Sequence, residues 1–204
     1  MTIIEEHAIQ ARITLSAVGW VISDAATMVG SVPGLYSIHA AQDGWAELGL
    51  DYRAGIPLYV GKSESNLAHR ELGQHFAINP AVPSRTGGST VRRSFAALLR
   101  EPLGLRGVPR NKDNPERFAN FGLEPDGDHL LTQWMHEHLT LAVWPMPNNV
   151  DIKQLGAVEI DVIKYWVPPL NIKDNPGRLR HLRVARAQLA ADARAWASRG
   201  HPVL

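Results

Sequence analysis

Hydrophobic and polar positions along the chain follow two periods, one typical of short strands and one of amphipathic helices. Two short apolar runs, residues 35–39 and 56–61, predict two strands that could pair as a long hairpin. A third run, residues 139–144, ends at two prolines and predicts a third strand. Apolar residues spaced three or four apart predict helices over residues 63–76, 89–100, 131–138, 149–166 and 177–198. This order of elements indicates an α+β fold with a small three-stranded, mainly antiparallel sheet flanked by helices.

Several of these helices begin at residues that favour a helix start. Ser63, Ser89 and Asn149 can each accept a hydrogen bond from an N–H group that the first helical turn leaves unpaired. Residues 101–128 are rich in proline, glycine and asparagine and are expected to be irregular. We expect one domain over residues 1–172 with an inserted basic segment at about 77–138, and a basic C-terminal helix within 173–204 that packs on the same domain.

Composition narrows the classes of protein to which the chain can belong. Its 204 residues, 45% of them hydrophobic and 20% charged, can bury one sizeable core. The absence of cysteine excludes disulfides, thiolate metal sites and cysteine nucleophiles. No apolar run approaches the roughly 20 residues that cross a bilayer, and the N-terminal segment carries acidic residues where a signal peptide carries basic ones. We therefore expect a soluble cytoplasmic protein.

Basic residues are concentrated in two parts of a chain whose formal net charge is only +1. Residues 85–117 hold eight basic and three acidic side chains, and residues 173–204 hold seven and two. Such blocks suggest local contacts with anions such as phosphates, although on charge alone solvated helix faces explain them more simply. Arg92, Arg93 and Arg100 are expected to face outward on the helix over 89–100. The first half of the last helix is crowded with basic residues, which are Arg178, Arg180, Arg183 and Arg186.

Glu159 is the most informative single residue, because it lies on an apolar helix stripe. In the helix over 149–166, Leu155, Val162 and Ile163 share this stripe with it. Burying a carboxylate costs free energy unless the group is paired, hydrogen-bonded or bound to a metal. A salt bridge, or a position at the edge of the stripe, explains Glu159 as well as a catalytic or metal-binding role does.

Two tyrosines and two basic residues also stand in positions that suit chemistry. Tyr36 and Tyr59 lie on the two strands of the predicted hairpin, where Gly61 allows another backbone or a ligand to come close. Lys62 follows directly, and Arg70 lies on the next predicted helix. A phenol can act as a base where a nearby cation lowers its pKa, and an arginine can stabilise charge on a phosphoryl group. Taken singly, each of these residues is explained as an ordinary core or surface side chain.

Together these residues form an ordered pattern. Gly34-Leu35-Tyr36 lies on the first strand and Tyr59-Val60-Gly61-Lys62 on the second, followed by Arg70, Glu159 and Pro169-Leu170-Asn171. The pattern resembles the signature of the GIY-YIG nucleases, with a leucine as a mild substitution in the first triplet, and it extends over residues 30–76 and 139–172. The resemblance implies a GIY-YIG-like fold and a metal-dependent endonuclease that hydrolyses phosphodiester bonds of nucleic acid, above all of DNA.

The resemblance also implies roles for the residues of the pattern. Tyr36 would be the general base or would position the attacking water, with Lys62 nearby to favour its phenolate. Glu159 would be the only protein ligand of one divalent ion, Mg²⁺ or Mn²⁺. Arg70 would hold the scissile phosphate, and Tyr59 would orient water or phosphate.

Further residues would steady the site or hold DNA. Asn171 would steady the site through hydrogen bonds. The long excursion between the first two strands and the segment at 77–138 resemble additions of the restriction-endonuclease branch, which grip DNA and can build a dimer. One such site cuts one strand at a time, so cleavage of both strands would need two sites, which a homodimer would supply. The residues expected to bind the substrate are Gly61, His75, Arg92, Arg93, Arg180 and Arg183.

Two other interpretations stay open. His129, His136, Glu137 and His138 could form part of a metal site, although His136 and His138 are two positions apart and therefore diverge on a helix. The chain could also be a nucleic-acid-binding protein without catalytic activity that uses the same basic helices. Replacing Glu159 with glutamine separates a nuclease, which would lose cleavage and keep DNA binding, from a binder, which would be unaffected.

Overall fold

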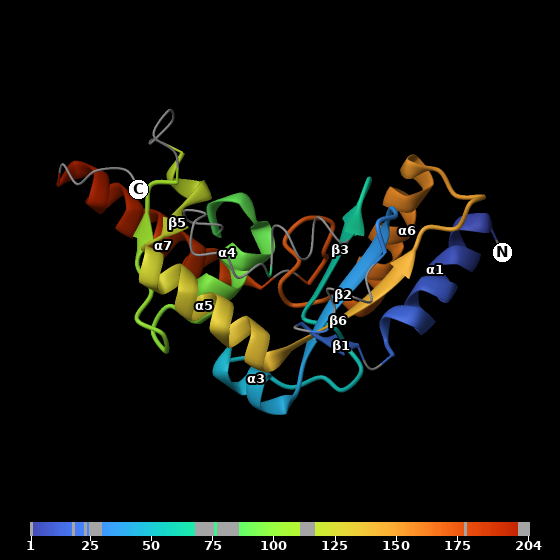
Figure 1. Cartoon of the computed structure of the whole chain (residues 1–204), viewed down its shortest axis with the longest axis horizontal. Coiled ribbons are helices and arrows are strands. Elements are labelled where there is room, and N and C mark those ends of the chain that lie inside the picture. Colours follow the sequence, from blue (N-terminus) through green and yellow to red (C-terminus); the bar gives the residue numbers. More distant parts are fainter. Residues whose placement is uncertain are drawn as a thin grey trace.

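An antiparallel sheet of four strands forms the centre of one half of the molecule (Figure 1). The structure is a computed structural model, and it describes residues 2–17, 19–22, 24, 30–67, 76, 86–110, 117–177 and 179–199. The strands lie in the order β1 (Trp20–Val21), β6 (Leu139–Pro145), β2 (Gly34–Ala40) and β3 (Tyr59–Ser63). β3 is therefore an edge strand, and its outer N–H and C=O groups need partners from outside the sheet.

The sheet confirms the predicted α+β class and the pairing of the two hairpin strands. β2 pairs with β3 from Gly34 opposite Ser63 to Ile38 opposite Tyr59, and it pairs with β6 on its other side. The sheet has four strands and not three, because β1 adds a two-residue pairing with β6 at the far edge. A strand of two residues is too short to show an alternating pattern, so periodicity does not predict it.

Two helices, α1 (Ile3–Leu15) and α6 (Ile152–Trp166), cover one face of the sheet (Figure 1). Leu35 of β2 and Val60 of β3 point toward these helices and share a buried cluster with Leu15 and Val158. Residues on either side of Leu35 and Val60 along the strands point to the opposite face, because successive side chains of a strand alternate. Each strand of the hairpin therefore contributes side chains to both faces.

α1 is not among the helices that the apolar periodicity predicts. Its fully buried positions are Ala8, Ala11 and Leu15, and the two alanines make its apolar stripe weak. The helix start carries a clearer signal, because Thr2 Oγ1 accepts a hydrogen bond from Glu5 N at 3.2 Å and Glu5 Oε2 accepts one from Thr2 N at 2.7 Å. The capping residues therefore identify this helix better than its hydrophobic pattern does.

The other face of the sheet packs on a second group of elements (Figure 1). These elements are η2 (Thr86–Gly88), α4 (Thr90–Leu98), β4 (Gly107–Val108), η3 (Phe118–Asn120), β5 (Gly122–Leu123), α5 (Pro125–His138) and α7 (Arg180–Ser198). α7 packs on α4, β4 and η3, and a short helix, α3 (Gln42–Glu47), packs on β2. None of the helices in the described ranges is long and apolar enough to cross a membrane.

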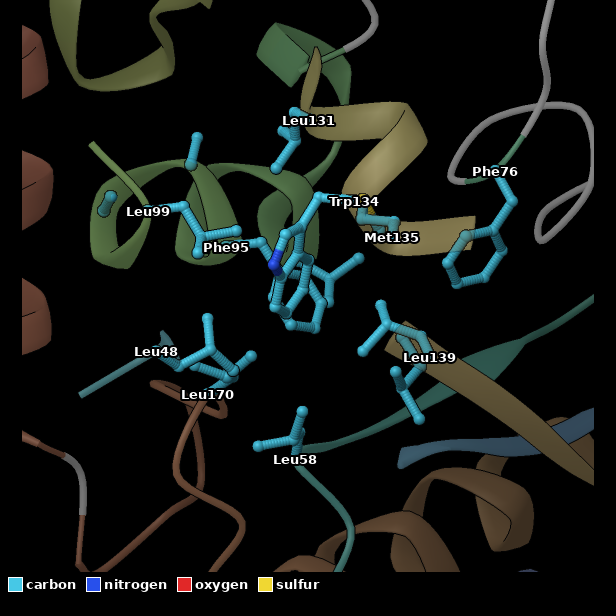
Figure 2. Packing of buried hydrophobic residues seen from close by; sticks show 14 of the residues in the cluster. Leu48, Leu58, Phe76, Phe95, Leu99, Leu131, Trp134, Met135, Leu139 and Leu170 are labelled. Atoms are coloured by element: carbon cyan, nitrogen blue, oxygen red, sulfur yellow. The ribbon is translucent and has the colours of Figure 1, made fainter. Parts of the chain in front are cut away.

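Aromatic and aliphatic side chains join this second group to the sheet. Figure 2 shows Phe95 of α4 and Trp134 of α5 at the centre of the junction, with Leu58, which precedes β3, and Leu170, which follows α6, below them. All four side chains are buried and belong to one cluster. The segments before β3 and after α6 are therefore fastened to the inserted helices as well as to the sheet.

The predicted helix ends are partly correct. Ser89 caps α4 as expected, with its Oγ accepting from Arg92 N at 3.1 Å. α6 begins after Asp151 and not at Asn149, because Asp151 accepts from Gln154 N at 2.7 Å and the Gln154 side chain accepts from Asp151 N at 2.9 Å. The helix expected after Ser63 falls mainly on residues 68–75, which lie outside the described ranges.

The described parts of the region expected to be irregular, residues 101–110 and 117–128, contain more regular structure than their composition suggests. β4 and β5 pair within it, with Gly107 opposite Leu123 and Val108 opposite Gly122. α5 begins inside it at Pro125, several residues earlier than predicted, because proline suits the first turn of a helix where its missing N–H costs nothing. Glycine and proline here mark element ends and close contacts.

His39 connects β2 to the end of α1. Its Nε2 lies 2.8 Å from the Leu15 carbonyl oxygen and 2.9 Å from Ser37 Oγ, and Ser37 Oγ donates to the same carbonyl at 2.8 Å. A neutral ring with its proton on Nε2 satisfies the carbonyl. Burial lowers the pKa of His39, and the hydrogen bond to Leu15 offsets only part of this effect.

We predict that the protein loses stability as the pH falls below the ordinary histidine pKa of 6.5. The unfolded chain protonates His39 near that value, whereas the folded protein does so only at lower pH, so in this interval the unfolded state binds more protons and gains free energy relative to the folded state. His39→Gln should flatten the dependence of the unfolding free energy on pH, measured by urea titration between about pH 5 and pH 7.5. His181→Gln, at an exposed position of α7, is the control, and equal pH slopes in the two variants would contradict the prediction.

Candidate active site

The register of the hairpin brings the two tyrosines together on one face of the sheet. Tyr36 of β2 lies opposite Gly61 of β3, and Tyr59 lies two positions before Gly61 on the same face. A Cβ atom on Gly61 would lie 2.5 Å from Cζ and Oη of Tyr36 and 2.8 Å from Cε1 of Tyr59. The bare glycine backbone thus lets the two rings approach to a centroid distance of 6.0 Å. Tyr36 is fully buried, and Tyr59 is half-buried.

Lys62 leaves the sheet on the opposite face, toward α6. Its Nζ lies 2.9 Å from Glu64 Oε1 and 3.8 Å from Glu159 Oε2. The residue of α6 that faces it is Gly156, where a Cβ atom would come within 3.2 Å of Nζ. The hydrogen bond to Glu64 is the main cause that raises the pKa of Lys62, the charge of Glu159 adds to it, and burial opposes both. Lys62 therefore stays protonated and acts as a cation, not as a base.

The register of the hairpin determines the face from which Lys62 extends. Tyr36 and Gly61 are paired and share a face, and Lys62 is the next residue along β3, so its side chain leaves the strand on the other face. The alternation of the strand directs Lys62 toward the two carboxylates, and its effect on the Tyr36 phenol stays a prediction.

Side chains from both faces meet in a hollow of about 1190 Å³ at the edge of the sheet. Tyr59 reaches it from one face, and Lys62 and Glu159 reach it from the other. Thr90 at the start of α4 forms part of the opposite wall. Glu159 follows the fully buried Val158 on α6, and its own side chain is 19% exposed, which places it at the border of the apolar stripe. The carboxylate is thus both ion-paired and open to the hollow.

Asn171 holds the edge strand between the two faces. Its Oδ1 accepts from Val60 N at 2.9 Å, and its Nδ2 donates to the Val60 carbonyl at 2.8 Å. Leu170 N donates to the Leu58 carbonyl at 2.9 Å, and the amide of Asn175 donates to the Asn171 carbonyl at 2.9 Å. The chain after α6 therefore replaces a neighbouring strand along the outer edge of β3.

The end of α6 turns the chain toward this edge. Val167 caps the helix with φ of 50°, a left-handed conformation that a β-branched residue rarely adopts, and two prolines follow. Arg53, in the excursion between β2 and β3, donates to the carbonyls of Trp166 and Val167 at 2.9 and 3.0 Å. These hydrogen bonds satisfy carbonyl groups that the helix end leaves unpaired.

Arg92 and Arg93 do not face solvent as predicted. Arg92 is fully buried, where it pairs with Asp128 at 3.2 Å and donates to Thr132 Oγ1 at 2.9 Å. Arg93 is 7% exposed and donates to the Gly87 carbonyl. The apolar stripe of α4 misleads here because residues 91–97 are all buried among neighbouring elements, so the helix has almost no solvent face. Arg92 is a structural residue and cannot contact DNA in this conformation.

The other residues predicted to bind the substrate do not lie together. Arg180 and Arg183 are exposed on the first half of α7, and their contact with the substrate stays a prediction. Gly61 is buried beneath the tyrosine rings, where it makes room for them. Arg70 and His75 lie outside the described residues.

The histidines of α5 contact neighbouring protein groups. His136 Nε2 lies 2.7 Å from the Phe76 carbonyl oxygen, and the ring of His138 stacks on Trp134, 3.3 Å from Glu47 Oε1. Among the described residues no group of three or more histidines and carboxylates could hold an ion. The described part of the chain therefore gives no support to a metal site built from these histidines.

Glu64 is the site residue that the sequence reasoning missed. It shares the Lys62 ammonium with Glu159 and lines the same hollow. Strand alternation gives no signal for it, because Glu64 follows the end of β3 and its approach to Lys62 depends on the bend there.

A comparison with protein families identifies one matching family model. The family model described as the GIY-YIG catalytic domain matches residues 50–190, more than half of the chain. The matched range contains Tyr59, Lys62, Glu159 and Asn171, and it begins after Tyr36. No curated protein and no solved structure matches the chain.

We predict that Gly61→Ala displaces the tyrosine pair. The new methyl group would overlap the Tyr36 ring, and overpacking of this kind costs about 1–3 kcal/mol of unfolding free energy. Urea unfolding and the near-ultraviolet circular dichroism of the tyrosines measure the two effects. Gly30→Ala is the control, since a Cβ atom there would meet only Val32 at 3.7 Å. An unchanged tyrosine signal in Gly61→Ala would contradict the described contact.

We also predict that Asn171→Ala destabilises the fold by about 2–4 kcal/mol, because it leaves the buried N–H and C=O of Val60 without partners. Asn148→Ala, at an exposed position, should change the unfolding free energy by about 0.5 kcal/mol or less. Chemical unfolding of both variants tests this, and similar values for the two would show that the amide of Asn171 does not hold β3.

Proposed function

The chain belongs to the GIY-YIG nuclease family, and we propose that it is a metal-dependent endonuclease that hydrolyses phosphodiester bonds of DNA. Membership indicates endonuclease activity, and enzymes of this family generally use divalent metal ions. The observation that carries the proposal is the meeting of Tyr59, Lys62 and Glu159 in one hollow at the edge of β3. This hollow offers a carboxylate, a cation and a phenol to a phosphodiester from a single side of the molecule.

The residues of the hollow suit a single hydrated divalent ion. Glu159 and Glu64 both approach the Lys62 ammonium, so two carboxylates and one cation share the site. Mg²⁺ is commonly bound through one or two carboxylates while it keeps several waters. We propose Glu159 as the ligand of one Mg²⁺ or Mn²⁺, which when bound would stabilise negative charge on the phosphate oxygens.

The chain's own side chains would divide the remaining work. Tyr59 lines the hollow, so its hydroxyl is the one proposed to orient water or phosphate. Tyr36, fully buried behind it, remains the proposed general base or water-positioning group, and water would have to reach its hydroxyl past Tyr59. Lys62 would hold the Glu159 carboxylate in place and offset phosphate charge, since its raised pKa keeps it protonated. Arg70 is proposed to hold the scissile phosphate.

DNA is the proposed substrate, and exposed basic residues of α7 suit contacts with a nucleic-acid backbone. Arg180 and Arg183 are exposed there and would contact the backbone of the duplex. Such contacts position a protein on DNA without reading its sequence. We further propose that cleavage of both strands requires two copies of the chain, since each copy supplies one site.

We predict that Glu159→Gln abolishes metal-dependent cleavage of supercoiled plasmid, with a rate lower by about 100-fold or more, because the neutral amide is a poor ligand for a divalent ion. DNA binding, measured by fluorescence anisotropy in EDTA, should change little. Asp161→Asn is the matched control, since Asp161 lies on the same helix, 39% exposed, and pairs with Arg12 away from the hollow.

Cleavage by wild type with Mg²⁺, its loss in EDTA and its loss in Glu159→Gln together support the proposal. Full cleavage by Glu159→Gln would overturn the role of Glu159. Tight binding without any cleavage by wild type, across duplex, branched and single-stranded substrates, would favour a non-catalytic nucleic-acid-binding protein.

A further inference from the structure

Three arginines from separate elements converge beside the hollow, and we refer to Arg93, Arg110 and Arg186 as the arginine cluster. Arg93 Nη2 donates to Thr90 Oγ1 at 3.3 Å, and Arg186 Nη1 donates to Ser94 Oγ at 3.4 Å, so both guanidinium groups lie against α4. The Arg110 side chain crosses Gly87, where a Cβ atom would come within 2.4 Å of its Cγ. Arg93 in turn donates to the Gly87 carbonyl. The backbone at Gly87 therefore links Arg93 and Arg110, and the charge of Arg186 is close enough to act on Arg93.

Acidic partners are missing from this cluster. Among the described residues, no carboxylate lies within ion-pair distance of Arg93, Arg110 or Arg186. Arg93 is 7% exposed, and its buried Nε has no hydrogen-bond partner. Burial, together with the neighbouring charges of Arg186 and Arg110, lowers the pKa of Arg93 to about 10. Three like charges thus stand close together, at a cost in folding free energy that no described acid offsets.

Two other arginines nearby are paired. Arg92, adjacent to Arg93 on α4, pairs with Asp128, and Arg100, just after α4, pairs with Asp192 of α7. The described residues therefore include acids that neutralise neighbouring arginines, and none of these acids pairs with the cluster. A buried donor without a partner and a group of repelling cations are features that an anionic ligand would satisfy.

The cluster borders the hollow on the side of Tyr59. Thr90, the partner of Arg93, lines the hollow directly. Burial lowers the pKa of Arg186, and an electrostatic interaction with Tyr59, which is close enough to act on it, partly offsets this effect. Glu159 and Lys62 reach the hollow from the other face of the sheet, so the cluster and the proposed metal ligand stand on opposite sides of Tyr59.

We propose that the arginine cluster binds a backbone phosphate of the nucleic acid other than the one that is cleaved. This inference rests on the proposed function, because the cluster adjoins the hollow in which cleavage would occur. Guanidinium groups form paired hydrogen bonds with phosphate oxygens, and one phosphate would reduce the repulsion among all three. Arg110 is exposed, Arg186 half-buried and Arg93 buried, so the site opens to solvent at one end and can admit a strand. Contacts of this kind would set the register of the strand without reading bases.

Inorganic phosphate tests the cluster without any nucleic acid. Thermal unfolding is measured in phosphate and in chloride at matched ionic strength, for wild type, Arg186→Gln, Arg110→Gln and Arg117→Gln. Wild type should gain about 2–4 °C in phosphate relative to chloride. Arg186→Gln and Arg110→Gln should lose this gain, and Arg117→Gln, at an exposed position before η3, should keep it. In chloride the first two variants should be at least as stable as wild type, because each removes a repelling charge, whereas a purely structural cluster would be weakened.

Binding of a short duplex, measured by fluorescence anisotropy in EDTA over a range of salt concentrations, tests the source of the phosphate. Arg186→Gln should bind about 10-fold more weakly, and its slope of log affinity against log salt should be smaller by about one. Arg186→Lys should recover the salt slope but not the full affinity, because an ammonium group cannot form the paired hydrogen bonds of a guanidinium.

The outcomes separate this inference from the proposed function. An equal phosphate gain in all variants would overturn the site, and a gain that depends on the cluster with unchanged DNA affinity would overturn the nucleic-acid phosphate as its ligand. DNA affinity that depends on Arg186 in a protein that does not cut would support the cluster while the nuclease proposal fails. A further outcome is cleavage that depends on Glu159 while Arg186 has no effect on DNA affinity. That result would support the nuclease proposal and overturn the phosphate site at the arginine cluster.

Discussion

The double hydrogen bond between the amide of Asn171 and the backbone of Val60 is the constraint on which the site depends. β3 is an edge strand, and its outer polar groups would otherwise face water or another chain. The Asn171 side chain satisfies the outer N–H and C=O groups of Val60, which lies between Tyr59 and Gly61. Because Asn171 follows α6, the same contact ties the helix that carries Glu159 to the strand that carries Lys62. The same pair of hydrogen bonds thus helps to position Tyr59, Lys62 and Glu159.

The segment that joins α6 to Asn171 contains a strained backbone conformation. Val167 ends α6 in the left-handed region, which costs a β-branched residue about 1–3 kcal/mol, and its surroundings must hold it there. Arg53 does so by bonding the last carbonyls of the helix, and Leu170 fills the junction with Phe95 that Figure 2 shows. The long excursion between β2 and β3 is therefore part of the support of the site, since it supplies Arg53.

Charges in this protein fall into groups with different physical roles. Arg92 and Asp128 form a buried pair with further hydrogen bonds, and such a pair fixes the orientation of α4 against α5. Lys62 and Glu159 are half-buried and Glu64 is exposed, so solvent screens the Lys62–Glu64 pair more than the Lys62–Glu159 pair. The arginine cluster has no acidic partner among the described residues. Lys62, Glu64 and Glu159 line the hollow, which the sheet and the start of α4 build together, and the family match includes both β3 and α4.

The sequence by itself determined the α+β class, the pairing of the hairpin and the presence of Glu159 on α6, because strand alternation, helix periodicity and turn residues are local properties. It could not decide which way Lys62 points, since that depends on the register of β2 and β3 and not on proximity in the chain. Nor could it show that Arg92 is buried, because an arginine on a helix is predicted to be exposed unless the elements packed around the helix are known. The convergence of Arg93 and Arg186, 93 positions apart, follows from the packing of α7 on α4, which only the tertiary structure decides.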